Sequence, residues 1–354
     1  MLLSRDDWRI ERAPVRQETP ILPPSRLFLI AAILLISIVV SSFVANRPLH
    51  VGTDTYSYVN VFNSLNYGHL TRISEPLFVG IALAVGSLTE NYKFFLFVCA
   101  MILLLFSLYA NHRLIDRVVM DPYRGRYITY LAFGLLLYSP FYFNMHVNIL
   151  RHGMAVPFLL LGYIMVMEKR YLAATALLFA SLGFHQSSLI NVLLAPLLVF
   201  NVRFLVLLFL ALSAIYLTSL SGIVLGPVFS ILNLTPSFES ISEYGASTSY
   251  YRSGVRFDFW LFTTFFVGMS LVAAWWNVVT EALPRILIVS SIPFLLFGYI
   301  SYSDRLLVFT WFMVSAVAAC CAAKILMNCD RTFLFVVAVL FNVATMGIFI
   351  GKLF

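Results

Sequence analysis

The stretch RHGMAVPFLLLGYIMVMEKRYLAATALLFASLGFHQSSLINVLLAPLLVF, residues 151–200, decides the fold class. It holds three apolar runs with short polar breaks between them, at 151–167, 171–184 and 187–200. Backbone groups in hydrocarbon must hydrogen-bond to one another, so each run is predicted to be a helix. The last two runs are short, which predicts a helical hairpin with His185 in a polar tip at one face of a membrane.

The same pattern extends through most of the chain. Of the 354 residues, 61% are hydrophobic and 11% are charged, whereas soluble domains carry roughly 25% charged residues. This composition excludes a soluble globular domain. The four cysteines lie in or beside apolar runs without zinc-ligand spacing, so a disulfide scaffold is excluded as well. The sequence therefore predicts an all-α polytopic membrane protein with about 11 transmembrane helices.

The apolar runs give a layout for the whole chain. Spanning helices are expected at 27–45, 94–110, 127–143, 151–167, 171–184, 187–200, 203–218, 257–276, 285–300, 306–323 and 332–350. The run 76–89 is shorter and is predicted to be a helix that does not cross fully. Residues 1–26 are expected to form a cytoplasmic tail, and 27–354 a single transmembrane domain with long outer segments at 46–93 and 219–256.

The positive charge supports this layout. The net charge of +7 comes from 23 basic and 16 acidic residues, and Lys and Arg accumulate in the cytoplasmic loops of membrane proteins. With the N-terminus inside, 15 of the 23 basic residues fall in cytoplasmic segments. Most of the others lie beside polar groups at outer helix ends. An arginine held near hydrocarbon costs from ~2.5 kcal/mol upward, so these residues suggest function.

Two acidic residues precede helices on the outer side. Asp54 follows the first span, and apolar residues at helical spacing after it predict an amphipathic helix on the membrane surface: Tyr58, Val61, Phe62 and Leu65. Glu75 precedes Pro76, which suits a first helical position. Each acid is a candidate general base. Each also suits a purely structural role, as the N-cap or the charge at a helix start.

Basic residues open or join helices on the same side. Arg151 begins a span beside Asn148 and His152, His185 lies in the hairpin tip, and Arg305 follows Asp304 at the start of another span. The alternatives are a snorkelling Arg151, a structural His185 in a tight turn, and an Arg305 that only pairs with Asp304.

The long outer segment 219–256 combines aromatic rings with small polar residues. Its tyrosines Tyr244, Tyr250 and Tyr251 suit stacking on the C–H faces of sugars. An ordinary wet loop with interfacial aromatic anchors is the alternative. Arg252 and Arg256 would share one face if this stretch were helical. No nucleotide-binding glycine loop and no HExxH motif occurs. The acidic residues do not cluster tightly enough in sequence to imply a dedicated metal site, although two carboxylates from distant segments could meet in space. No metal and no cofactor is expected.

In order and spacing, the outer motifs resemble the EpsG family. They are Gly52-Thr53-Asp54 with Tyr56, Glu75-Pro76-Leu77-Phe78, Arg151 at a helix start, Phe184-His185-Gln186-Ser187, and Arg305. The resemblance covers roughly residues 50–315. That family is associated with exopolysaccharide and O-antigen polymerisation by Wzy-type polymerases. The layout is more remotely similar to GT-C membrane glycosyltransferases, although Asp54 lacks the adjacent acid that often accompanies a metal there.

The resemblance implies a glycosyltransferase of the bacterial inner membrane whose site faces the periplasm or cell exterior. Its substrates would be oligosaccharides linked to undecaprenyl pyrophosphate, and a chain-length regulator is an expected partner; no nucleic acid is expected. The implied catalytic residues are Asp54, Glu75 and His185. The implied pyrophosphate-binding residues are Arg151 and Arg305, with Arg72, Arg252 and Arg256. The implied sugar-binding residues are Tyr56, Tyr244, Tyr250 and Tyr251.

Other functions remain open at this point. A GT-C enzyme that transfers one sugar and a polysaccharide ligase are the nearest alternatives. A flippase or transporter of lipid-linked sugars belongs to another class, but transporters place polar residues near the bilayer midplane and often show repeated halves. A purely structural membrane protein is the remaining alternative.

Overall fold

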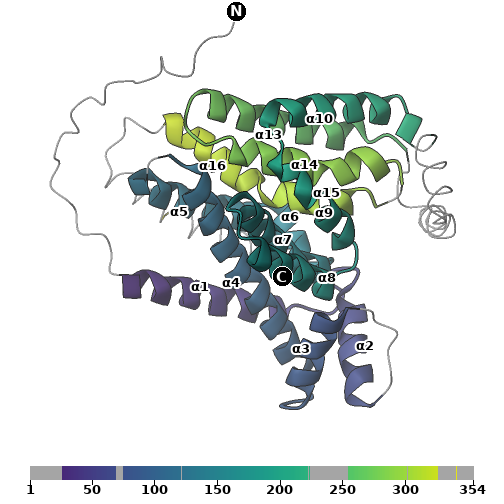
Figure 1. The fold of residues 1–354 in the computed structure, drawn as a ribbon. Coiled ribbons are helices and arrows are strands. Elements are labelled where there is room, and N and C mark those ends of the chain that lie inside the picture. Colours follow the sequence, from purple (N-terminus) through teal and green to yellow (C-terminus); the bar gives the residue numbers. More distant parts are fainter. Residues whose placement is uncertain are drawn as a thin grey trace, which may run out of the picture.

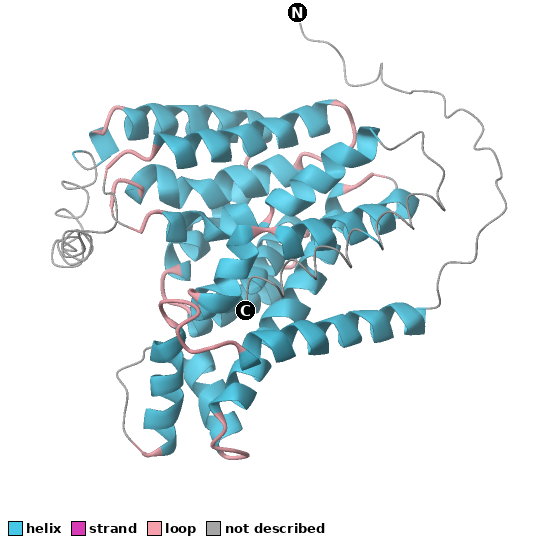
Figure 2. Cartoon of the chain, turned by 180° about the vertical axis from the view of Figure 1, so that it is seen from behind, coloured by secondary structure: helices cyan, strands magenta, loops and turns pink. Residues whose placement is uncertain are grey.

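The computed structural model describes residues 26–68, 75–120, 122–221, 223, 254–300, 302–325 and 340. In these ranges all named elements are helices, which confirms the predicted all-α class (Figures 1 and 2). The β pairing found there is one isolated antiparallel bridge between Val119 and Val279. The predicted tail up to Ser25 and the predicted span 332–350 lie outside the described residues, apart from position 340.

The helices follow the apolar runs closely. They are α1 (Arg26–Asn46), α2 (Thr55–Asn66), α3 (Pro76–Gly86), α4 (Tyr92–Val118), α5 (Pro122–Tyr138), α6 (Pro140–Val147), α7 (Leu150–Met167), α8 (Tyr171–Phe184), α9 (Ser188–Leu194), a 3-10 helix (Ala195–Val199), α10 (Val202–Leu217), α13 (Phe257–Trp275), α14 (Ala282–Phe297), α15 (Asp304–Phe312) and α16 (Val314–Ile325). Four stretches of the described chain are long and apolar enough to cross a membrane: Tyr92–Val118, Leu150–Met167, Phe257–Trp275 and Asp304–Ala322.

Helix α7 forms the centre of the core. Leu159, Leu160 and Tyr163 are fully buried, and the Tyr163 hydroxyl donates to the backbone oxygen of Asn191 at 2.7 Å. This bond links α7 to α9, the second arm of the predicted hairpin. Helices α8 and α9 turn at His185 as expected. In Figure 1, α10, α13 and α14 run side by side, and α2 and α3 form a pair set across their direction.

The predicted span 127–143 is wrong as a single helix. Helix α5 ends at Tyr138, and α6 begins at Pro140 after Ser139, whose backbone is extended. A residue before proline is disfavoured in the helical region, and proline has no N–H to donate. Ser139 then caps α6, because its hydroxyl accepts from the Tyr142 N–H at 3.4 Å. The break separates the polar residues of α6 from the apolar α5.

The expected contact of the apolar face of α2 with the membrane surface needs correction. Its apolar face packs on protein: Phe62 is fully buried and stacks on Phe95 of α4, with ring centroids 4.8 Å apart. Tyr58 meets Phe78 of α3 edge-on at 6.0 Å. Tyr56, on the opposite face, is 62% exposed. The amphipathic pattern is therefore explained by burial against α3 and α4.

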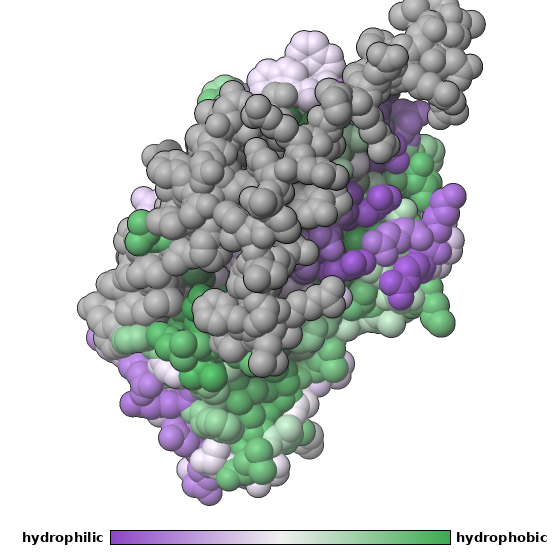
Figure 3. All heavy atoms as spheres, turned by 90° about the vertical axis from the view of Figure 1, so that its left-hand side faces the viewer, coloured by the Kyte–Doolittle hydropathy of each residue, from purple (hydrophilic) through white to green (hydrophobic). Residues whose placement is uncertain are grey.

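Chain reversals bring distant segments together at two ends of the bundle. At the first, here called the Glu75 end, lie Asp54, Glu75, Arg151, His185 and Arg305. At the other, the Arg113 end, Arg113 pairs with Glu168 at 3.1 Å, and the Thr280 N–H donates to the Val118 oxygen at 2.7 Å. Because α7 connects Arg151 to Glu168, the two ends lie at opposite ends of one long apolar helix. Figure 3 shows hydrophilic patches beside broad hydrophobic surface.

Cysteine labelling tests this arrangement of ends. In a chain whose four native cysteines are replaced by alanine, Tyr56→Cys and Gln186→Cys sit exposed at the Glu75 end, and Lys169→Cys and Glu281→Cys sit exposed at the Arg113 end. A membrane-impermeant maleimide applied to intact cells is expected to label only one pair. The other pair should react only after permeabilisation. Labelling of one position from each pair in intact cells would contradict the fold.

Candidate functional site

Glu75 is the centre of the candidate site. It occupies the N-cap position of α3, yet its side chain makes no capping hydrogen bond and is 6% exposed. Instead Oε1 accepts from Nδ1 of His185 at 2.7 Å, and Oε2 pairs with a guanidinium nitrogen of Arg151. The Glu75 side chain therefore forms ion pairs with distant segments and does not cap the helix that follows it.

Local structure explains why these three side chains meet. Pro76 starts α3 directly after Glu75, Arg151 lies in the first turn of α7, and His185 follows the last residue of α8 in an extended conformation. The hairpin tip approaches α3 closely at Gly183, where an added Cβ would lie 2.7 Å from Leu77. A larger residue at this position would force either the Leu77 side chain or the hairpin tip that carries His185 to shift.

The two partners of Glu75 decide its charge state. Burial by itself raises the pKa of this carboxyl. The hydrogen bond from His185 and the positive charge of Arg151 act in the opposite direction and outweigh it, so the pKa lies below the ordinary value of 4.5. Glu75 is therefore ionised at neutral pH. An ionised carboxylate only accepts hydrogen bonds, which assigns the proton on Nδ1 of His185.

Tyr58 contacts Arg151 and bonds to the backbone at the start of α7. Its ring lies 5.9 Å from the Arg151 guanidinium, and the Phe78 ring lies 5.8 Å away on another side. Its hydroxyl accepts from the Leu150 N–H at 3.0 Å and donates to the Asn148 oxygen at 2.8 Å. Burial, together with the charge of Asp54, raises the pKa of Tyr58 well above its ordinary value. Tyr58 thus stays neutral and fixes the start of α7.

A second ion pair lies beside the first. Asp54 occupies the N-cap position of α2 without a capping hydrogen bond, and its Oδ2 lies 3.7 Å from a guanidinium nitrogen of Arg305. The alternative pairing of Arg305 with Asp304 is not the one observed. Arg305 also lies over the ring of Tyr302 at 4.8 Å. Asp54, Arg151 and Arg305 all act electrostatically on the Tyr58 hydroxyl, so the two pairs form one cluster.

Sequence reasoning missed a buried arginine that holds this cluster together. Arg47 is 2% exposed and donates to the Thr55 hydroxyl at 3.0 Å and to the Val44 oxygen at 2.5 Å. Burial lowers its pKa to about 10, which leaves it charged at neutral pH. Asn148 adds a second link, since its Oδ1 accepts from the Thr53 N–H at 2.7 Å. The position of Arg47 directly after the first apolar run was the available signal.

The other predicted site residues fall outside this cluster. Tyr56 is exposed beside Asp54. Arg256 precedes α13 and pairs with Asp258 at 2.6 Å, with its guanidinium 3.7 Å from the centre of the Phe259 ring. Residues 254–256 are not helical, so the condition for a helical face shared by Arg252 and Arg256 is not met there. Five predicted residues lie outside the described part of the chain: Arg72, Tyr244, Tyr250, Tyr251 and Arg252.

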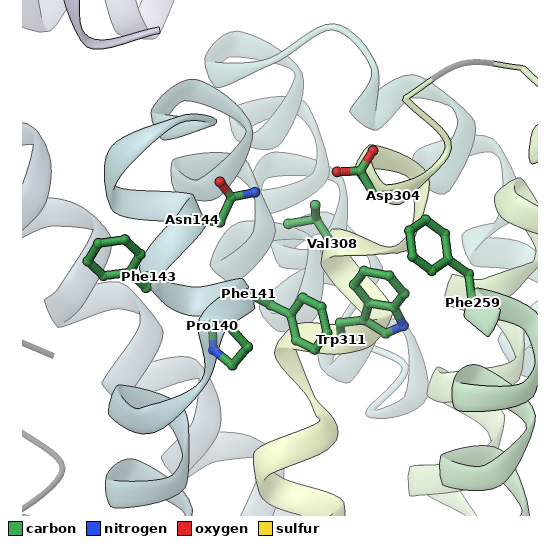
Figure 4. A pocket seen from close by; sticks show the side chains of 8 residues that line it. All are labelled: Pro140, Phe141, Phe143, Asn144, Phe259, Asp304, Val308 and Trp311. Atoms are coloured by element: carbon green, nitrogen blue, oxygen red, sulfur yellow. The ribbon is translucent and has the colours of Figure 1, made fainter. Parts of the chain in front are cut away.

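A pocket of about 330 Å³ lies close to the cluster, between α6, α13 and α15 (Figure 4). Its lining residues are Pro140, Phe141, Phe143, Asn144, Phe259, Asp304, Val308 and Trp311. Asp304 is the chain neighbour of Arg305, which places the pocket directly beside the second ion pair.

The cluster combines groups for two chemical tasks. The side chains of Arg151 and Arg305 are 32% and 35% exposed, so each guanidinium has donors that reach solvent. Guanidinium groups bind phosphate oxygens through paired hydrogen bonds and stay charged. His185, oriented by Glu75 through Nδ1, presents Nε2 as a proton acceptor. Within the described ranges, no three His, Cys, Asp or Glu side chains form a candidate metal site.

Replacement of Tyr58 by phenylalanine tests the support of α7. The variant removes the hydroxyl that bonds Leu150 and Asn148, leaving two backbone groups without that partner. A loss of about 1–3 kcal/mol in the free energy of unfolding is expected, measured on the purified protein. Tyr56→Phe on the exposed face of the same helix is the matched control and should have no effect. Equal stability of both variants would contradict the assigned role.

The charge state of Glu75 gives a pH prediction. Because its pKa is lower in the folded than in the unfolded protein, Glu75 stabilises the fold above pH 4.5 and this contribution is lost as the pH falls through the folded value. The difference in melting temperature between the wild type and Glu75→Gln should therefore shrink as the pH is lowered from 7 toward 3.

Glu281→Gln is the control for this experiment, because Glu281 is an exposed partner of Arg285 at the other end. The melting temperature of this variant should depend on pH in the same way as that of the wild type. If the difference in melting temperature between the wild type and Glu75→Gln stays constant over the whole pH range, Glu75 is not an ionised, paired carboxylate.

Comparison with models of known protein families finds a match over most of the chain. The model of the EpsG family matches residues 30–352, which includes every described member of the Glu75 cluster. Neither the curated proteins nor the solved structures contain a match. Since the family model covers most of the 354 residues, this polytopic helical chain belongs to the EpsG family.

Proposed function

We propose that the protein is a polymerase-type glycosyltransferase that joins oligosaccharide repeat units carried on undecaprenyl pyrophosphate. Family membership supports a polysaccharide polymerase-type role in general. The observation that carries the finer proposal is the Glu75 cluster, in which a carboxylate-oriented imidazole lies beside two partly exposed guanidinium groups. These are the groups that a transfer from a pyrophosphate carrier needs.

In the proposed reaction, a hydroxyl oxygen of the acceptor sugar forms a bond to C1 of the donor sugar. The bond between C1 and the pyrophosphate oxygen breaks, and its electron pair stays on the pyrophosphate. Arg151 and Arg305 would bind this leaving group as its negative charge grows. Fixed positive charge at the site where negative charge develops is usually the largest single catalytic contribution.

The acceptor hydroxyl must lose its proton as the new bond forms. Of the three predicted bases, the geometry favours His185, because Glu75 holds Nδ1–H and leaves Nε2 free to accept. Glu75 itself is engaged by two partners, and Asp54 is engaged by Arg305. Glu75 would thus be a positioning residue for both His185 and Arg151.

The membrane setting completes the proposal. The Glu75 end would face the periplasm or cell exterior, where lipid-linked repeat units are displayed, and a chain-length regulator would bind nearby. Polar groups that gather at helix ends, as they do here, favour an enzyme at the membrane surface over a transporter, whose polar groups lie near the midplane.

Single replacements at the cluster test the proposal. Arg151→Gln, Arg305→Gln and His185→Gln are each expected to lower the rate of polymer formation at least about 100-fold. The amount and chain length of the polysaccharide, resolved by gel electrophoresis, are the readout, with membrane levels of each variant measured in parallel. Arg113→Gln removes a paired arginine at the opposite end and is the matched control, with normal polymer expected.

Normal polymer from all three cluster variants at normal membrane levels would overturn the proposed function. Addition of single sugars without a change in polymer length would instead identify a monosaccharide transferase.

A further inference from the structure

We infer that the pocket between α6, α13 and α15 is a saccharide-binding subsite that holds a sugar ring of the lipid-linked substrate next to the reacting bond. The inference rests on the proposed function and adds a location and residues for substrate recognition. The cavity volume of about 330 Å³ lies at the lower end of the roughly 300–1,000 Å³ typical of small-molecule sites.

The walls of the pocket suit a sugar. Phe141, Phe259 and Trp311 line it with aromatic rings, the side chains that pack against the C–H faces of sugars. The three rings form a rigid group, with centroids 4.2 Å apart for Phe141 and Trp311 and 5.0 Å apart for Phe259 and Trp311. The indole N–H of Trp311 donates to the Thr263 hydroxyl at 3.2 Å, which fixes the orientation of the ring.

One end of the pocket is polar. Figure 4 shows the Asn144 amide and the Asp304 carboxylate facing each other above the rings. Both side chains are half-buried. A carboxylate and an amide supply the acceptors and donors that sugar hydroxyl groups need. The prenyl tail of a lipid carrier offers no hydrogen bond to either group, so the polar end favours a sugar over the lipid chain.

Two connections link the pocket to the Glu75 cluster, one through hydrogen bonds and one along the chain. The Asn144 Oδ1 accepts from the Asn148 amide at 2.5 Å, and Asn148 in turn binds the Thr53 N–H beside Asp54. On the other side, Asp304 is followed by Arg305, which pairs with Asp54. A sugar held between Asn144 and Asp304 would therefore lie beside the proposed pyrophosphate-binding arginine.

The binding test uses a defined probe. Oligosaccharide fragments released by mild acid from the polysaccharide of the host cell are added to the full-length protein in lipid nanodiscs, and binding is followed by saturation-transfer NMR. Phe259→Leu and Asp304→Asn are each expected to weaken binding roughly tenfold, as the loss of one stacking contact or one hydrogen bond to a charged group would. In elongation assays, the KM for the lipid-linked oligosaccharide should rise by about the same factor with little change in kcat.

Matched controls lie elsewhere in the chain. Phe265→Leu removes an exposed ring from the same helix as Phe259, and Glu281→Gln removes an exposed carboxylate at the Arg113 end. Both should bind the fragments as the wild type does. Asp304→Asn keeps the size of the side chain, so it provides a second measurement if Phe259→Leu does not fold.

The outcomes separate the subsite from the function. If the Arg151, Arg305 and His185 variants lose elongation at normal membrane levels but Phe259→Leu and Asp304→Asn leave Kd and KM unchanged, the subsite is wrong and the function stands. The same conclusion follows if the wild type shows no saturable binding of the fragments, or if Phe265→Leu weakens binding as much as Phe259→Leu. If Arg151→Gln, Arg305→Gln and His185→Gln all leave elongation unchanged at normal membrane levels, the proposed function itself fails.

Discussion

The buried carboxylate of Glu75 is the constraint on which the arrangement of the site depends. A desolvated charge is costly unless it is paired and hydrogen-bonded, and Glu75 is 6% exposed. Its two partners lie 76 and 110 positions away in the sequence, on α7 and after α8. Removal of one partner would leave a buried charge incompletely paired. The chain must therefore bring α3, α7 and the hairpin tip together, and this meeting creates a cationic, proton-accepting surface.

The surrounding structure holds that surface in place. Arg47 and Tyr58 bond the backbone around the start of α2 and α7, so the loops at this end are fixed by polar contacts. The break at Ser139 has a related consequence, because it sets the direction of α6, which carries Asn144 and, one turn later at its C-cap, its hydrogen-bond partner Asn148. A continuous helix through Pro140 would carry Asn144 elsewhere. The reactive groups and the neighbouring aromatic pocket thus share one scaffold.

The apolar runs predict most helices and the hairpin, because hydrocarbon forces each run to satisfy its own backbone. They also place Asp54, Glu75, Arg151, His185 and Arg305 at one end, where the structure brings them together. The ion pairs of Glu75 and Asp54 were not predictable from the sequence. An acid before a helix suits an N-cap as well as an ion pair, and contacts between distant segments determine which of the two forms. The same limit applies to α2, because its apolar stripe is compatible both with a membrane surface and with packing against α3 and α4. The Ser139–Pro140 break did have a local signal in the proline.

A double-mutant cycle between Glu75 and Arg151 tests the central claim most directly. The free energies of unfolding of the wild type, Glu75→Gln, Arg151→Gln and the double variant would be measured in one lipid system. If the buried carboxylate and the guanidinium depend on each other, the double variant loses less stability than the two single losses together, with a coupling between about 0.5 and 3 kcal/mol. Strictly additive losses would contradict the account, because they would show that the two side chains do not interact.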